Sequence, residues 1–285
     1  MNNMEKNLTI ATLVKEVDRI YLDNSILSID QSSKPNGHRY YETKSIAITL
    51  GAAYNYSKVP IRVLNRFYER TDALCELILK DSKFTASEAI IEEYRPLVNH
   101  LENAANHLHR KSSSVKRGNK EIILRTSLER CKDILATLNG RLTPLMRSLG
   151  EDGIQDIIRF IYEAKLHHSS DGSWVKRYNK VEKKPSKADA EISAQALLWS
   201  SLHQEKTAIL TGDLDIINII RNFEKYEKLA KLPKSLNEIS ARMVGVYLPN
   251  REKWDRELEL TKAWPELKEI PPKLTAPPIE NGLHN

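Results

Sequence analysis

Short apolar runs alternate along the chain with longer segments in which apolar residues recur at helical spacing. The short runs are bounded by polar or turn-forming residues, which is typical of buried strands. They cover 19–23, 83–86, 207–211 and 243–248, and the helical patterns cover 61–78, 87–97, 187–203 and 216–226. Strands that alternate with helices predict an α/β fold with a parallel sheet of four or five strands, flanked by helices.

The remaining length divides into an inserted part and a tail. Residues 101–185 read as further helices, interrupted near the basic, serine-rich stretch 110–120 and near 150–153, and followed by a polar loop. Pro96 predicts a kink or a restart of the helix before this insertion. We therefore expect a single domain over 1–262, with a helical insertion at about 101–185. The proline-rich segment 263–285 is predicted to be an extended or disordered tail.

Acidic residues stand where two of the predicted strands end. Asp23 closes the run 19–23, and Asp213 and Asp215 follow the run 207–211. Asp189 begins a predicted helix, and Glu93 borders the buried face of another. Sites in α/β sheets form at the carboxyl ends of strands, so these side chains are expected to share one crevice.

Carboxylates in one crevice repel each other. At about 4 Å, one pair costs about 4 kcal/mol at an effective dielectric near 20. Such a cluster persists when a cation neutralises it or when one member takes a proton. Oxygen ligands without histidine or cysteine favour Mg²⁺ or Mn²⁺.

Four stretches, in order, resemble the motifs of the PIN domain nucleases. They are 20–25, 90–94, 189–196 and 209–215. The resemblance implies a PIN-like α/β fold and metal-binding, catalytic roles for Asp23, Glu93, Asp189 and Asp213, with Asp215 as a further metal ligand and Ser25 and Thr211 as supporting hydroxyls.

The same resemblance implies a function. PIN domain proteins hydrolyse phosphodiester bonds with Mg²⁺ or Mn²⁺, and they usually cleave RNA, often single-stranded. The expectation is therefore a single-strand-selective endoribonuclease, either an RNA-processing enzyme or the toxin of a toxin–antitoxin pair. Two interactions are left open: binding to an antitoxin or other protein inhibitor, and assembly into a homo-oligomer.

Each acidic residue also has a purely structural interpretation. Ser186 and Asp189 have the spacing of a helix capping box, and Asp213 or Asp215 could cap the helix that begins near 216. Asp23 could start a turn. Two other functional classes therefore stay open: a non-catalytic PIN-like module that binds RNA or protein, and a helical interaction protein whose working part is 40–170.

Charge adds a candidate surface for nucleic acid. The chain has 44 basic and 38 acidic residues, a net charge of +6. Residues 110–120 and 176–187 each carry a net +5. In the second stretch, the predicted nucleic-acid-binding residues are Lys176, Arg177, Lys180, Lys183 and Lys184, interleaved with aromatic residues.

Composition excludes several classes of protein. With 40% hydrophobic and 29% charged residues, the chain reads as globular and soluble. No apolar run is long enough to span a membrane, and the N-terminus does not resemble a signal peptide. Two cysteines exclude a disulfide scaffold and a zinc site built on cysteine pairs. The expected location is the cytoplasm.

Overall fold

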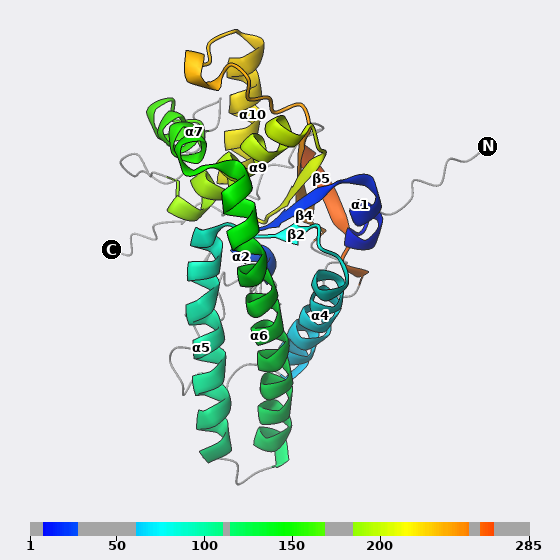
Figure 1. Cartoon of the computed structure of the whole chain (residues 1–285). Coiled ribbons are helices and arrows are strands. Elements are labelled where there is room, and N and C mark those ends of the chain that lie inside the picture. The colour runs from blue at the N-terminus through cyan, green and yellow to red at the C-terminus, as the bar shows by residue number, and fades with distance from the viewer. Residues whose placement is uncertain (1–7, 28–60, 111–114, 169–184, 251–256, 265–285) are drawn as a thin grey trace, which may run out of the picture.

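The computed structural model describes residues 8–27, 61–110, 115–168, 185–250 and 257–264. Its helices and strands form an α/β architecture around a five-stranded sheet, with a pair of long helices that extends away from it (Figure 1). In chain order the elements are α1 (Ile10–Glu16), β1 (Arg19–Leu22), α2 (Asn24–Leu27), α4 (Ile61–Lys80), β2 (Phe84–Thr85), α5 (Glu88–Arg110), α6 (Val115–Leu149), α7 (Glu151–Glu163), α9 (Lys187–His203), β3 (Thr207–Leu210), α10 (Leu214–Lys228), the 3-10 helix η2 (Lys234–Leu236), β4 (Val244–Pro249) and β5 (Leu260–Trp264).

The sheet has the strand order β2-β1-β3-β4-β5. The first four of these strands are parallel to their neighbours, and all four runs predicted as strands belong to them. β5 is antiparallel to β4, so the sheet is mixed. The prediction of a parallel sheet is therefore correct for four strands and wrong for the fifth. β5 also includes positions 263 and 264, where the tail was expected to begin.

The central elements are buried on all sides. Ile20, Tyr21 and Leu22 of β1 are fully buried, as expected for an inner parallel strand. In α9, every residue from Ala188 to Ser200 is buried. A helix without a polar face belongs inside a protein, and α9 contacts α5, α7, α10 and the sheet.

The paired helices α5 and α6, which we call the arm, contain much of the predicted insertion. α5 is one helix that continues through Pro96, so it carries both Glu93 near the sheet and Arg110 at its far end. α6 returns toward the sheet, and α4 packs beside it. The arm is therefore continuous with a helix of the α/β domain, and the helical insertion has no separate beginning at 101.

One arginine ties the arm to the sheet. The guanidinium of Arg141 in α6 donates hydrogen bonds to three main-chain oxygens, those of Ile78, Asp81 and Phe84, at 2.7–2.9 Å. These oxygens lie at the end of α4, in the turn and in β2.

Among the described helices, none is both long and apolar enough to cross a membrane.

Candidate functional site

The register of β1 and β3 brings the ends of two predicted strands together. Leu22 pairs with Leu210, so the next residues, Asp23 and Thr211, are neighbours. The main-chain N–H of Asp23 donates to the oxygen of Leu210 at 3.0 Å. The hydroxyl of Thr211 donates to Oδ2 of Asp23 at 2.8 Å. The strand pairing itself therefore builds the first part of the site.

Asp23 is largely enclosed, with only 5% of its surface exposed. Besides Thr211, the hydroxyl of Ser25 donates to Oδ2 and the main-chain N–H of Asn24 donates to Oδ1. Ser25 in turn accepts from the main-chain N–H of Gly212 at 2.7 Å. The two residues expected to support the site thus both orient Asp23.

Asp213 and Asp215 lie at the first turn of α10. Asp213 is the N-cap, and its Oδ1 accepts from the N–H of Asp215 at 2.8 Å. Its own N–H donates to the hydroxyl of Thr211 at 2.8 Å, which links the helix start to Asp23. Asp213 is partly exposed and Asp215 is buried.

Asp189 approaches from α9. It forms a capping box with Ser186: its N–H donates to the serine hydroxyl at 3.0 Å, and its Oδ2 accepts from the serine N–H at 3.2 Å. The structural interpretation of Asp189 is therefore correct, as is that of Asp213. Neither cap uses all the lone pairs of its carboxylate, so both groups keep acceptor capacity.

Asp189 lies near the other three aspartates of the site. Burial, followed by the nearby carboxylates of Asp213, Asp23 and Asp215, raises the pKa of Asp189 to about 8. Burial also raises the pKa of Asp23, with a smaller contribution from Asp213, against the hydrogen bonds from Ser25, Thr211 and Asn24 that lower it. An added proton or cation would stabilise this arrangement.

Glu93 lies at the rim of the site. It is exposed on α5, and its Oε2 accepts from the side-chain amide of Asn24 at 3.3 Å. Partial desolvation and the charge of Asp23 raise its pKa. Asn24 therefore joins Glu93 to Asp23. Asn24 was not among the predicted site residues, and its position directly after Asp23 was the signal for this role.

A further buried glutamate fixes the helix that carries Glu93. Oε1 of Glu191 in α9 accepts from the N–H of Ala89, at the start of α5, and from the side-chain amide of Gln195, both at 3.2 Å. Burial raises the pKa of Glu191. Sequence reasoning missed this contact, because it joins residues 102 positions apart.

The donor set suits a hard cation in its chemistry, since it consists of carboxylate and hydroxyl oxygens. As arranged, however, the described residues contain no group of three or more histidine, cysteine or acidic side chains placed to hold a metal ion. A cation would therefore have to draw the carboxylates closer together. Asp23, Asp189 and Asp213 are the candidates, with Asp215 and Glu93 beside them.

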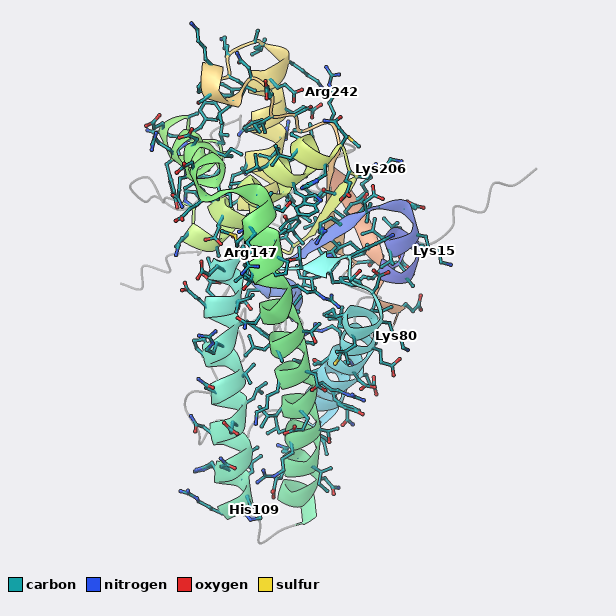
Figure 2. All side chains as sticks on the ribbon, in the orientation of Figure 1. Lys15, Lys80, His109, Arg147, Lys206 and Arg242 are labelled. Carbon is teal, nitrogen blue, oxygen red and sulfur yellow. The ribbon has the colours of Figure 1, made fainter. Side chains whose placement is uncertain are left out.

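Of the two predicted basic stretches, the described residues include most of the first and only the end of the second. Lys176, Arg177, Lys180, Lys183 and Lys184 lie outside the described residues. The first basic stretch lies at the far end of the arm, where Figure 2 shows His109. The 23 residues of α5 span about 35 Å, so that end is remote from the carboxylates.

Comparison of the chain with protein-family models, with curated proteins and with solved structures found no match. Function is therefore inferred from the residues themselves and from their arrangement.

Proposed function

We propose that this chain is a Mg²⁺- or Mn²⁺-dependent nuclease that hydrolyses phosphodiester bonds in single-stranded RNA. One observation carries the proposal: carboxylates at the end of β1 and at the starts of α9 and α10 lie near one another at the carboxyl ends of parallel strands, where burial and the neighbouring carboxylates raise the pKa of Asp189 to about 8. That position in an α/β sheet is where substrates bind. Carboxylates that repel one another there are suited to a divalent cation and a phosphate.

Each residue of the site has a role in this proposal. Asp23, Asp189 and Asp213 would hold the metal, with Asp215 and Glu93 as further ligands at its sides. When bound, the metal would supply an activated water and charge stabilisation at the phosphate. Ser25 and Thr211 keep Asp23 oriented by donating to Oδ2, and Asn24 holds Glu93 at the rim. Without a metal, burial and the neighbouring carboxylates favour the protonated form of Asp189 by raising its pKa to about 8.

The test compares two aspartate variants. Asp213→Asn removes a charge from the site, yet asparagine remains a good N-cap for α10. Asp133→Asn is the matched control, since Asp133 is exposed on α6 in the arm. Each protein is incubated with labelled single-stranded RNA, with single-stranded DNA of the same sequence and with duplex RNA, in Mn²⁺, Mg²⁺ or EDTA.

We expect the wild type and Asp133→Asn to cut single-stranded RNA internally with metal and not with EDTA. Asp213→Asn should cut at least about 100-fold more slowly. Loss of a residue that only supports a metal ligand typically lowers activity about 10- to 100-fold, and loss of the ligand itself should lower it more. Equal cleavage by the two variants, or no cleavage with either metal, would refute the proposal.

The alternative is a PIN-like module that binds RNA or protein without cutting. The observation in its favour is that no metal-holding group of three is preformed in the described residues. Titration with Mn²⁺, followed by its paramagnetic resonance signal, separates the two. If the wild type binds Mn²⁺ and Asp213→Asn binds it more weakly, the result supports the nuclease. If the wild type does not bind Mn²⁺, the result supports the non-catalytic module.

A further inference from the structure

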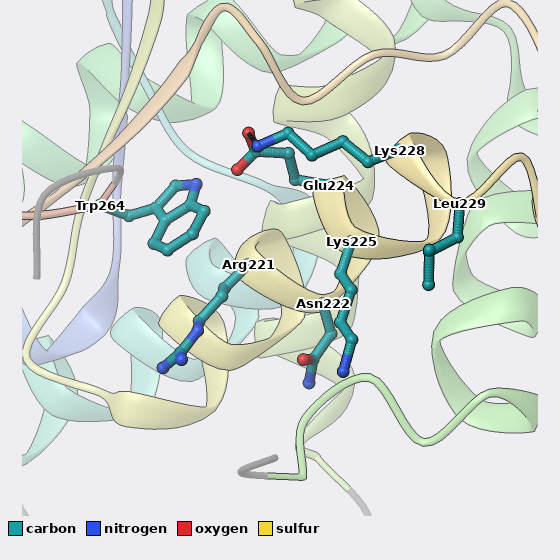
Figure 3. Close-up of a pocket in the computed structure, with 7 residues that line it drawn as sticks. All are labelled: Arg221, Asn222, Glu224, Lys225, Lys228, Leu229 and Trp264. Atoms are coloured by element: carbon teal, nitrogen blue, oxygen red, sulfur yellow. Dashed lines mark ion pairs between the residues drawn. The ribbon is translucent and has the colours of Figure 1, made fainter.

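A pocket of about 470 Å³ lies between the second half of α10 and the last residue of β5 (Figure 3). Its size falls in the range of small-molecule sites. Five of its seven lining residues belong to α10, and the other two are Leu229, the C-cap of that helix, and Trp264. None of them takes part in the carboxylate site, which lies at the beginning of α10.

The residues around the pocket carry excess positive charge, whereas apolar atoms form most of its surface. Its lining includes Arg221, Lys225 and Lys228 against a single acid, Glu224. Nζ of Lys228 lies 2.6 Å from Oε1 of Glu224, so this pair is neutral. Arg221 and Lys225 are exposed and form no ion pair with any other described residue. They are four positions apart and thus share one face of the helix. Two cationic groups are therefore available to an anionic ligand.

Trp264 supplies a flat apolar wall. Its indole packs against the hydrophobic core but stays partly exposed. The guanidinium of Arg221 lies 5.9 Å from the centre of the ring, within range of a cation–π contact. Figure 3 shows the indole beside α10, between Arg221 on one side and the Glu224–Lys228 pair on the other.

An aromatic face next to cations that form no ion pair within the described part of the chain favours a ligand with both a flat ring and a phosphate. Bases stack on tryptophan, and arginine and lysine bind phosphate oxygens. An acidic peptide would satisfy the charges but would leave the indole without a stacking partner. We propose that this pocket binds one nucleotide unit, with the base on Trp264 and the phosphate on Arg221 and Lys225.

The pocket also bears on the proposed nuclease. From Asp215 to Lys225 the chain advances ten residues along α10, about 15 Å. A single strand held at the pocket could therefore reach the carboxylates. This last step rests on the proposed function, whereas nucleotide binding itself does not.

The experiment measures binding by the full chain in EDTA, where no metal-dependent cleavage can occur. The probes are a fluorescein-labelled ten-nucleotide oligoadenylate, followed by anisotropy, and adenosine monophosphate, adenosine and inorganic phosphate, followed by calorimetry. Trp264→Ala should weaken oligoadenylate binding about 5- to 100-fold. Arg221→Gln should weaken it as well and make the dependence on salt less steep, by about 0.7 in the log–log slope. Lys234→Gln, which changes an exposed lysine of η2 outside the pocket, is the matched control and should bind as the wild type does.

The separate outcomes decide the proposal. Tighter binding of the oligomer than of adenosine monophosphate identifies a nucleic acid as the source of the nucleotide, and equal binding identifies a free nucleotide. The proposal is overturned if adenosine monophosphate binds no more tightly than inorganic phosphate. It is also overturned if oligoglutamate competes for the site as well as the oligoadenylate does. If Arg221→Gln binds the oligoadenylate as tightly as Lys234→Gln does, the proposal is also overturned. This comparison does not depend on whether Trp264→Ala folds. Binding is measured in EDTA and through residues outside the carboxylate site, so failure of the nuclease leaves this test intact.

Discussion

Replacing Asp189 by asparagine should remove much of the pH dependence of stability. The pKa of Asp189 is about 8 in the folded chain, against an ordinary value of 3.8. The difference corresponds to roughly 6 kcal/mol between the two protonation states, as an upper limit. Asparagine keeps the shape and can still accept from the N–H of Ser186, so the capping box survives in part.

The direction in which stability changes with pH follows from proton binding. Between about pH 4 and pH 8 the folded chain holds a proton on Asp189 that the unfolded chain has released. This contribution to the free energy of unfolding is therefore complete below pH 4, falls as the pH rises, and is lost above pH 8. The slope is at most about 1.4 kcal/mol per pH unit, or about 4 kcal/mol between pH 5 and pH 8.

Urea denaturation of the metal-free protein in EDTA, at several pH values from 5 to 8, measures the effect. The free energy of unfolding of the wild type should fall relative to that of Asp189→Asn as the pH rises. Asp133→Asn should follow the wild type. Parallel curves for the wild type and Asp189→Asn would refute the convergence of buried carboxylates at this site.

Two further variants test the supports of the site and of the arm. Gly212→Ala would place a Cβ 3.3 Å from the hydroxyl of Ser25, which must then shift. We expect cleavage of RNA to slow by about 10-fold with a small change in stability, whereas Gly140→Ala, with nothing nearby, should leave cleavage unchanged. Arg141→Gln removes three hydrogen bonds to main-chain oxygens and should lower the free energy of unfolding by about 2–4 kcal/mol in urea, and Arg147→Gln, on the exposed face of α6, should not. Equal midpoints for the two arginine variants would contradict the role of Arg141.

The inner strands could be predicted because their signals are local. β1 and β3 are short apolar runs that end at aspartates, and burial on both faces makes such runs continuous. β5 has no such signal. Thr261 and Lys262 are adjacent and both exposed, and a register shift interrupts its pairing with β4. The alternation that identifies an edge strand is therefore missing from the sequence.

Helix α5 of the arm shows a different limit of prediction from the sequence. Pro96 removes one main-chain donor from α5, and the local rule predicts a kink or a restart. The helix continues because its buried face packs along α6 over many residues. Tertiary packing of this kind joins distant segments and cannot be read from a window around the proline.

For the site, sequence spacing could not separate a helix cap from a metal ligand. Asp189 and Asp213 are both caps, and yet they lie near enough to affect each other. What brings them together is the pairing of β1 with β3 and the packing of α9 against the sheet. The contact between Thr211 and Asp23 spans 188 positions and depends on that register alone.

The capping arrangement has a consequence for how firmly an ion could be held. α9 begins two residues before Asp189 and α10 begins directly after Asp213, so two helix N-termini lie beside the carboxylates. Each start carries about half a positive elementary charge. Together they offset about one carboxylate, so the fold already provides part of the countercharge that a cation would bring. A metal bound here would therefore be exchangeable with solvent, and the chain should stay folded after dialysis against a chelator.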